Sequence, residues 1–154
     1  IIYRGPNLMQ GYWRKPVETA EAFGGGWFHS GDLVRQDEEG FVWVVDRKKD
    51  MIISGGENIY CSEVENTLFA HPDILDVAVY GRADEKWGEV PVAAVVLAPG
   101  TTLTIEALQD WLQDKLARFK QPKALVTLEA LPRNAGGKVN KVALRAADRE
   151  TANA

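Results

Sequence analysis

Residues that form disulfides or bind metal ions are scarce in this 154-residue chain. It contains one cysteine, Cys61, and two histidines, His29 and His71. One cysteine excludes an internal disulfide and favours an intracellular, cytoplasmic protein. Three such residues cannot make a convincing zinc site, so we expect no tightly bound metal.

Long hydrophobic runs are absent as well. No apolar stretch approaches the roughly 20 residues that cross a bilayer, and none has the pattern of a signal peptide, so no transmembrane segment is predicted. The chain starts on Ile1-Ile2-Tyr3 rather than on methionine. An apolar, strand-like start of this kind predicts that the chain continues a longer protein.

Charge is unevenly distributed along the chain. Residues 115–145 contain eight basic side chains and one acid, for a net charge of +7, whereas residues 1–114 contain nine bases and nineteen acids, for a net charge of −10. The overall charge of −4 argues against a general nucleic-acid binder. The basic segment includes Lys138, which follows Gly136 and Gly137. A lysine on a mobile Gly-Gly turn suits a phosphate or carboxylate ligand.

Apolar periodicity and turn residues predict a mixture of strands and helices. A hairpin is expected over residues 31–46, with its turn at Asp37–Gly40. Ser62 and Glu65 have the spacing of a capping box, which predicts a helix that ends near Ala70. Further helices are predicted over 17–23, 104–117 and from Asn140 to about 149, and further strands over 74–80, 92–97 and 124–128. We therefore expect an α+β protein.

Two glycine-rich segments resemble phosphate loops only superficially. Residues 54–58 (SGGEN) lack the spacing of a dinucleotide fingerprint. The segment that ends at Lys138 is not a Walker A motif, because Pro132 stands where glycine is needed and Val139 where serine or threonine is needed. Neither segment is predicted to be an autonomous nucleotide site.

Four other features each allow a functional and a structural interpretation. Asp32 can accept hydrogen bonds from two sugar hydroxyls or cap its own turn. Arg47, in a run of five charges, can contact ribose or phosphate or simply be solvated. Trp87 can cover a ligand tunnel or the local core. The segment 118–123 can stack a nucleotide base on Phe119 between basic residues, or complement a helix C-terminus.

Six short motifs occur in one order along the chain. They are GYW at 11–13, WFHSGD at 27–32, DRKKDMIISGGENI at 46–59, DEKWGE at 84–89, FKQPK at 119–123 and LPRNAGGK at 131–138. In this order and spacing they resemble the C-terminal third of the adenylate-forming enzymes, and within that superfamily the acyl- or aryl-CoA synthetases. The likeness extends from about Gly5 to Arg145.

The resemblance implies a two-step reaction and a moving domain. ATP with Mg²⁺ and a carboxylic acid, fatty or aryl, would give an acyl-adenylate and pyrophosphate. The thiol of coenzyme A (CoA) would then give a thioester and AMP. Residues 1–47 would be the β-rich end of a large N-terminal domain, residues 48–50 a hinge, and residues 51–154 a compact lid with a β-hairpin and a small mixed sheet flanked by helices.

The resemblance also assigns roles to individual residues. Asp32 and Arg47 would bind the ribose and nearby phosphate of the nucleotide, and Lys49 would be the hinge residue. Lys138 would bridge the acyl carboxylate and the α-phosphate in the first step, where negative charge collects in the transition state. The residues expected to contact CoA are Ser54, Gly55, Gly56 and Trp87 along its thiol arm, and Phe119, Lys120 and Lys123 at its nucleotide.

The chain departs from the family pattern at two positions and lacks several family segments. Gln121 stands where some relatives have a basic residue, and Cys61 where relatives often have proline at a helix start. The family's phosphate loop, adenine-binding segment and acyl pocket are not found in the sequence. The chain by itself is therefore expected to have no ligase activity.

Two other classes of protein fit parts of the pattern. An adenylation domain that loads a carrier protein would normally be followed by a helical domain with a phosphopantetheine serine, and the sequence has none. A non-catalytic module that binds CoA or a nucleotide would not need Asp32, Arg47 and Lys138 together.

Overall fold

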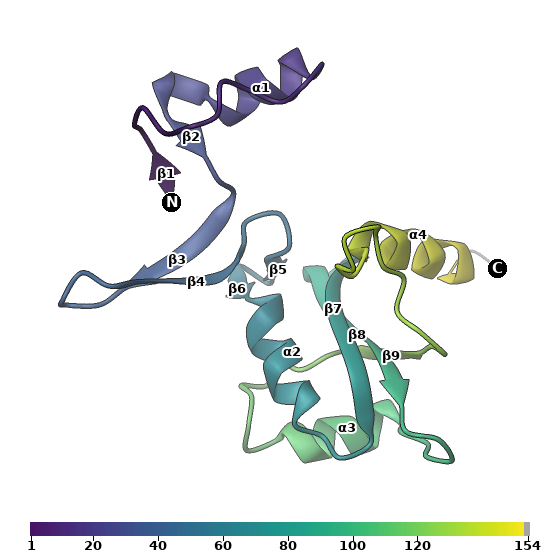
Figure 1. The fold of residues 1–154 in the computed structure, drawn as a ribbon. Helices are drawn as coiled ribbons and strands as arrows, with labels where there is room; N and C mark the ends of the chain where they lie inside the picture. The colour runs from purple at the N-terminus through teal and green to yellow at the C-terminus, as the bar shows by residue number, and fades with distance from the viewer. Residues whose placement is uncertain (153–154) are drawn as a thin grey trace. The chain divides into compact units, whose positions relative to one another are not determined.

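A computed structural model describes residues 1–152 of the chain. These residues form two compact units, one over Ile1–Lys49 and one that begins at Asp50 (Figure 1). They are called here the N-terminal unit and the C-terminal unit.

The N-terminal unit consists of two small antiparallel sheets and one short helix. Its elements are β1 (Ile2–Tyr3), α1 (Pro16–Ala22), the 3-10 helix η1 (Gly24–Gly26), β2 (Phe28–His29), β3 (Asp32–Gln36) and β4 (Val42–Arg47). β1 pairs with β2, and β3 with β4. The carboxylate of Asp37 accepts a hydrogen bond from the backbone of Phe41 at 2.8 Å and so closes the turn between β3 and β4. The predicted hairpin over residues 31–46 is confirmed.

The C-terminal unit is built on a mixed five-stranded sheet. Its strands are β5 (Ile52–Ser54), β6 (Glu57–Ile59), β7 (Ile74–Asp84), β8 (Gly88–Leu97) and β9 (Ala124–Thr127). β8 pairs antiparallel with β7, parallel with β9, and at one end with β5. Three helices accompany the sheet, α2 (Cys61–Phe69), α3 (Ile105–Leu112) and α4 (Lys141–Ala152). The predicted α+β class, with a mixed sheet flanked by helices, is confirmed.

The sheet is buried on both faces because alternate residues of β7 and β8 point to opposite sides. Val79, Ala93 and Val95 belong to one apolar core, which also contains buried residues of α2 and α3. Tyr80 and Val92 belong to a second core, which also contains Leu144 of α4 and Leu131. This two-sided burial explains why both strands read as apolar runs rather than as alternating ones.

The central hairpin is longer than the sequence predicted. The strand expected to end at residue 80 continues to Asp84, and the strand expected to start at residue 92 starts at Gly88. The carboxylate of Asp84 accepts hydrogen bonds from the backbone N–H groups of Lys86 and Trp87, both at 2.9 Å. These bonds tighten the turn and fix Trp87 at the tip of the hairpin.

The helix predicted over residues 104–117 begins as expected but ends early. The hydroxyl of Thr104 accepts a hydrogen bond from Ala107, and α3 stops at Leu112. Gln121 is buried, and its amide donates to the carbonyl oxygens of Leu112 at 3.4 Å and Leu116 at 3.0 Å. Because its amide is buried and bonded to these two backbone carbonyls, the Gln121 side chain is structural and unavailable to a ligand.

The predicted capping box at Ser62 and Glu65 is wrong. The N-cap of α2 is Tyr60, and its side chain makes no capping hydrogen bond. The carboxylate of Glu65 instead accepts a hydrogen bond from the backbone of Val79 at 2.8 Å. A tertiary contact to β7 has therefore taken the side chain that the local pattern assigned to the helix start.

Candidate functional site

Asp32 and Arg47 are opposite one another on the β3–β4 hairpin. Their Cα atoms are register partners, and Nε of Arg47 lies 3.4 Å from Oδ1 of Asp32. The hydroxyl of Ser30 accepts a hydrogen bond from the backbone of Asp32 at 3.0 Å. The side chain of Arg47 is 54% exposed. The backbone at Asp32 is therefore held in place, and the half-exposed guanidinium of Arg47 is open to an anionic ligand.

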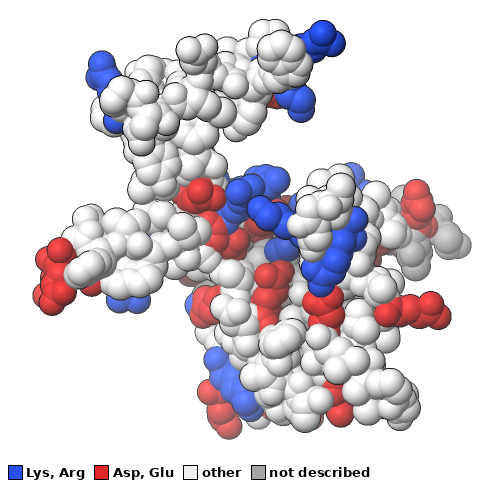
Figure 2. All heavy atoms as spheres, in the orientation of Figure 1, with Lys and Arg blue, Asp and Glu red and all other residues white. Residues whose placement is uncertain are grey.

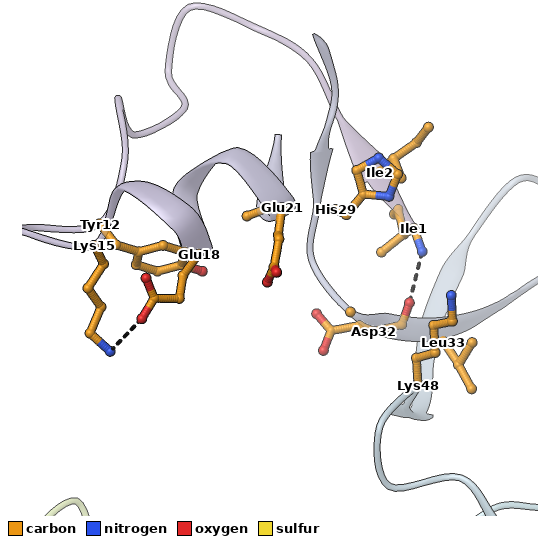
Figure 3. A pocket seen from close by; sticks show the side chains of 12 residues that line it. Ile1, Ile2, Tyr12, Lys15, Glu18, Glu21, His29, Asp32, Leu33 and Lys48 are labelled. Carbon is orange, nitrogen blue, oxygen red and sulfur yellow. Dashed lines mark hydrogen bonds and ion pairs between the residues drawn. The ribbon is translucent and has the colours of Figure 1, made fainter. Parts of the chain in front are cut away.

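Two cavities of the N-terminal unit surround this pair. One, of about 640 Å³, is lined by Asp32 and Lys48 together with residues of α1 (Figure 3). In Figure 3 the carboxylate of Asp32 extends from β3 toward the α1 side of this space. The other, of about 480 Å³, is lined by Arg47, Lys48 and Lys49 with the backbone around Gly31. Lys48 lines both cavities, and the motif-based assignment gave it no ligand role.

Lys49 is exposed and is the last residue of the N-terminal unit. It lies in a turn directly before Asp50, at which the C-terminal unit begins.

One cavity of the C-terminal unit collects most of the residues assigned to CoA. It measures about 550 Å³, and its lining residues are Ser54, Gly55, Glu57, Trp87, Arg118, Phe119 and Lys123. They come from three separate places: the β5–β6 hairpin, the tip of the β7–β8 hairpin and the segment after α3. Residues about 70 positions apart in sequence therefore share one site.

Gly55 brings the backbone of β5 against the indole of Trp87. Its φ angle is +58°, and a Cβ atom there would lie 2.7 Å from Cε3 of Trp87. Only glycine combines this angle with so close an approach. Trp87 is 47% exposed, so one part of its ring lines the cavity edge and the rest meets solvent.

Two of the predicted CoA residues do not line this cavity. Gly56 is absent from its wall. Lys120 is turned away, because its amine pairs with both carboxylate oxygens of Glu63 at 2.6 and 2.8 Å. Glu57 and Arg118 line the cavity although sequence reasoning gave them no ligand role. Arg118 belongs to the basic, aromatic segment 118–123, but its charge was explained as complementing a helix C-terminus, so no ligand was assigned to it.

The turn before Lys138 is closed rather than loose. Oδ1 of Asn134 accepts hydrogen bonds from the backbone N–H groups of Gly136 and Lys138, both at 3.0 Å. The guanidinium of Arg133 donates to the carbonyl oxygen of Gly137 at 2.8 Å. This closed turn has far more internal bonding than the mobile Gly-Gly segment expected from sequence, and it fixes the backbone from which the exposed Lys138 side chain projects.

Folding neutralises half of the basic segment. Four of its eight basic side chains form ion pairs with acids from the earlier part of the chain: Lys120 with Glu63, Arg133 with Asp76, Lys141 with Glu65 and Arg145 with Asp50. Figure 2 accordingly shows blue and red side chains intermixed on the visible face of the C-terminal unit.

The basic residues that remain unpaired are the informative ones. Within residues 1–152, Arg118 and Lys123 at the cavity and Lys138 at the turn form no ion pair. Lys115 instead lies over the ring of Trp111, with Nζ 4.1 Å from its centroid. Within the basic segment, the positive charge that has no acidic partner therefore lies at two places that can meet an anion.

Two further observations concern metals and membranes. Across the described part of the chain, no cluster of three or more His, Cys, Asp or Glu side chains is placed to hold a metal ion. None of the helices seen in residues 1–152 has the length and apolar character needed to cross a membrane.

Comparison with known proteins gives one consistent family. The family model of the AMP-binding enzyme C-terminal domain matches residues 63–138. An indoleacetate–CoA ligase of Aromatoleum aromaticum is 52% identical over 92% of this chain, and a 2-succinylbenzoate–CoA ligase of Geobacillus kaustophilus is 45% identical over 90%. The chain covers 28% of each of these two relatives.

A solved structure agrees with these sequence relatives. The o-succinylbenzoate CoA synthetase of Bacillus subtilis, in complex with an acyl-adenylate intermediate, matches 94% of this chain with a TM-score of 0.84 and 41% identity. The match covers 29% of that protein. The chain thus spans less than a third of the length of the relatives it matches.

Proposed function

The chain belongs, through residues 63–138, to the AMP-binding enzyme C-terminal domain family, and from this premise we propose that it is the C-terminal part of an AMP-forming acid–thiol ligase. The proposed enzyme converts a carboxylic acid, fatty or aryl, and ATP to an acyl-adenylate and pyrophosphate. It then transfers the acyl group to CoA. The relatives named above act, by their names, on acids that carry an aromatic ring.

One observation carries the proposal. Among the basic residues of segment 115–145, those without an ion pair or aromatic partner in the described chain are Arg118, Lys123 and Lys138. Two of them line the cavity around Trp87, and the third stands on the closed turn. An enzyme that handles two phosphorylated substrates in succession needs free positive charge at two sites.

The first step uses Asp32, Arg47 and Lys138 in this proposal. The carboxylate of Asp32 accepts hydrogen bonds from the ribose hydroxyls, and the exposed guanidinium of Arg47 donates to the ribose or a phosphate. The Lys138 amine lies between the acid carboxylate and the α-phosphate as the carboxylate oxygen attacks phosphorus and pyrophosphate leaves. It stabilises the negative charge that collects there.

The second step uses the cavity of the C-terminal unit. The thiol arm of CoA passes the backbone at Gly55, where the missing side chain leaves room, and lies along Trp87. The nucleotide stacks on Phe119, and Arg118 and Lys123 contact its phosphates. The thiol sulfur attacks the acyl carbon of the adenylate and AMP leaves. Two free cations suit the several phosphates of CoA better than the single phosphodiester of a carrier-protein arm.

The remaining parts of the proposal concern domains and location. Residues 1–47 end a large nucleotide-binding domain, residues 48–50 form the hinge with Lys49 at its centre, and residues 51–154 are the lid. Mg²⁺ enters as part of the ATP substrate, and no residue of this chain is assigned to it. A cytoplasmic location follows from the use of ATP and CoA, which are intracellular metabolites.

The two steps give a direct test in the longer enzyme. Lys138→Ala should lower adenylate formation, followed as pyrophosphate release, by about 10²–10³-fold, the usual effect of removing one group that stabilises transition-state charge. The same variant should make thioester from supplied acyl-adenylate at nearly the normal rate. Lys123→Met should do the reverse, raising the KM for CoA and sparing adenylate formation. A Lys138→Ala enzyme with normal adenylate formation would overturn the proposal.

A further inference from the structure

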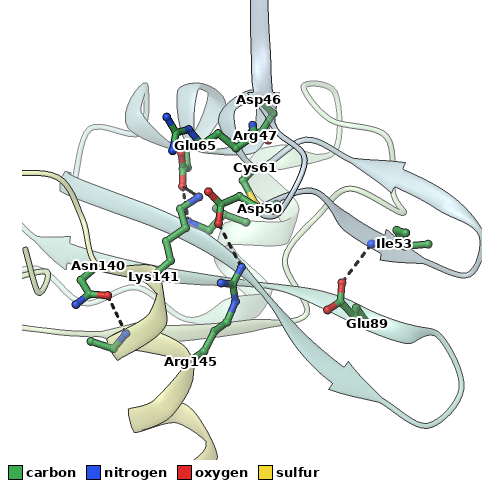
Figure 4. A network of polar contacts seen from close by, with 12 residues as sticks. Asp46, Arg47, Asp50, Ile53, Cys61, Glu65, Glu89, Asn140, Lys141 and Arg145 are labelled. Carbon is green, nitrogen blue, oxygen red and sulfur yellow. Dashed lines mark hydrogen bonds and ion pairs between the residues drawn. The ribbon is translucent and has the colours of Figure 1, made fainter. Parts of the chain in front are cut away.

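Helix α4 connects the turn of Lys138 to the first residue of the C-terminal unit. The helix begins at Lys141, three positions after Lys138, and the side chain of Asn140 accepts a hydrogen bond from Ala143 at 3.2 Å. One helical turn later on the same face is Arg145. Figure 4 shows Lys141 and Arg145 extending from α4 toward the carboxylates of Glu65 and Asp50.

The two carboxylates that receive α4 are themselves fixed. Nζ of Lys141 lies 2.8 Å from Oε1 of Glu65, which also accepts a hydrogen bond from the backbone of β7. Nη2 of Arg145 lies 3.6 Å from Oδ1 of Asp50. The thiol of Cys61 donates to the backbone carbonyl of Asp50 at 2.9 Å. The start of α2 therefore holds Asp50, the last residue of the proposed hinge.

The same face of the helix also makes contacts with β7. Asp148 of α4 accepts two hydrogen bonds from the guanidinium of Arg82 on β7. Leu144 is buried in the core that contains Tyr80. At the other end, the backbone N–H of Asn140 donates to the carbonyl oxygen of Pro132 at 2.7 Å, and so joins α4 to the base of the Lys138 turn. The links between Asp50 and Lys138 are thus the ion pair of Arg145 at 3.6 Å, the helix itself, its core contact and a short backbone hydrogen bond.

We propose that α4 is a rigid arm that sets the position of Lys138 relative to the hinge, and that Arg145 is a positioning residue for adenylate formation. This inference rests on the proposed function, because it assumes that Lys138 reaches the reacting oxygens after rotation at Lys49. A misplacement of about 1 Å is enough to cost a reaction up to about 10²-fold. A lysine carried at a distance from its pivot therefore needs a stiff connection to that pivot.

The geometry also limits the effect of Arg145 to one of the two steps. The cavity around Trp87 is built from the β5–β6 hairpin, the β7–β8 tip and the segment after α3. Among the residues whose side chains the structure describes, none of α4 lines it. Loss of the contact between Arg145 and Asp50 should therefore disturb Lys138 and leave thioester formation intact.

The first experiment measures the two steps separately in the longer enzyme. Arg145→Met should lower the kcat of adenylate formation by about tenfold, within the range for a displaced reacting group, without changing the KM for ATP. Thioester formation from supplied acyl-adenylate should keep its rate, and Arg145→Lys should recover most of the loss.

Arg149→Met is the matched control. It removes an arginine one turn further along α4 that has no ion pair among residues 1–152. This change should affect neither step.

A double-mutant cycle decides whether Arg145 acts through Lys138. In a Lys138→Ala background, Arg145→Met should cause no further loss of adenylate formation. Equal losses with and without Lys138, or an equal loss in both steps, would overturn the inference. If Lys138→Ala alone has no effect, the proposed function fails instead. If Arg145→Met does not fold, Asp50→Asn removes the same ion pair, leaves the carbonyl bond to Cys61 in place and should give the same pattern.

Discussion

The backbone N–H of Gly55 donates a hydrogen bond to the carbonyl oxygen of Trp87 at 2.8 Å, and the indole ring fills the space toward which a Cβ atom on Gly55 would point. The contact joins the end of β5 to the tip of the β7–β8 hairpin, where Ser54 and Gly88 are register partners. The shape of the proposed CoA cavity therefore depends on a glycine at this position.

Gly55→Ala should destabilise the chain and reduce CoA binding together. The positive φ costs an L-residue about 1–2 kcal/mol, and the overlap with the indole adds about 1–3 kcal/mol. Urea denaturation of the chain and calorimetric titration with CoA would measure the two effects.

Gly56→Ala is the control for this change. Its φ is also positive, at +88°, but no atom lies within 4 Å of its Cβ position. Only the backbone cost of about 1–2 kcal/mol applies there. If both variants lose equal stability and equal CoA affinity, the ring contact is unimportant.

Glu65→Ala should be one of the more damaging changes in α2. It leaves the backbone N–H of Val79 and the amine of Lys141 without their partner, and both Glu65 and Lys141 are largely buried. Removing one member of such a group costs about 2–4 kcal/mol. The free energy of unfolding from urea titration would show it.

Glu63→Ala, two residues earlier in the same helix, provides the comparison. Its ion pair with Lys120 involves a carboxylate side chain that is 41% exposed. Partly exposed pairs contribute about 0–1 kcal/mol. Similar losses for the two variants would contradict the distinction between the buried and the exposed pair.

The fate of Glu65 also illustrates what sequence can and cannot predict. The capping-box pattern is a local rule, and it fails because the side chain finds a partner on β7, 14 residues away in sequence. Lys120 is likewise absent from the cavity wall, because its amine pairs with Glu63, which is 57 residues away in sequence. Tertiary pairing of long charged side chains leaves no trace in a single sequence.

Features governed by local or periodic rules were predicted well. The turn at Asp37–Gly40 fixed the hairpin, but Asp32 lies opposite Arg47 because the register shifts between Leu33 and Val34, an irregularity that the sequence did not predict. Apolar runs located β7, β8 and β9. The ends of β7 and β8 at the hairpin tip were not predicted, because charged residues interrupt the apolar pattern there. The sequence predicted a helix to residue 117, and the helix terminus explained the charge of Arg118. Because α3 ends at Leu112, that explanation no longer holds, and Arg118 lines the cavity instead.

The stability of the chain should fall between about pH 10 and pH 12. Burial and the negative charge of Asp148, opposed by Arg82, raise the pKa of Tyr80 to about 12. An unfolded tyrosine has a pKa of about 10. A raised folded pKa gives stability that is complete below the unfolded value and is lost as pH rises toward the folded value. Two pKa units correspond to about 2–3 kcal/mol.

Tyr80→Phe isolates this contribution. Urea denaturation at several pH values should show a smaller loss above pH 10 in the variant than in the parent chain. Some loss of stability above pH 10 should remain in the variant, because Lys141 also titrates there with a raised pKa. Burial lowers the pKa of Lys141, but Cys61, Glu65 and Asp50 more than offset this, so its pKa is also raised. An identical pH profile for variant and parent would refute the role of Tyr80.

Asp32→Asn should impair nucleotide binding without harming the fold. In the longer enzyme the KM for ATP should rise at least about tenfold, because hydrogen bonds to a charged group contribute about 1.5–3 kcal/mol. The chain itself should lose no more than about 1 kcal/mol, because the pair with Arg47 is half-exposed and its atoms lie 3.4 Å apart.

Asp37→Asn separates ligand binding from hairpin stability. Asp37 lies in the same hairpin, but its carboxylate accepts the bond that closes the turn. It lines neither of the two cavities beside Asp32 and Arg47. The change should lower the unfolding free energy by about 0.5–1.5 kcal/mol, the worth of one such hydrogen bond, and leave the KM for ATP unchanged. A rise in KM with Asp37→Asn equal to that with Asp32→Asn would mean that hairpin integrity, rather than the Asp32 carboxylate, governs nucleotide affinity.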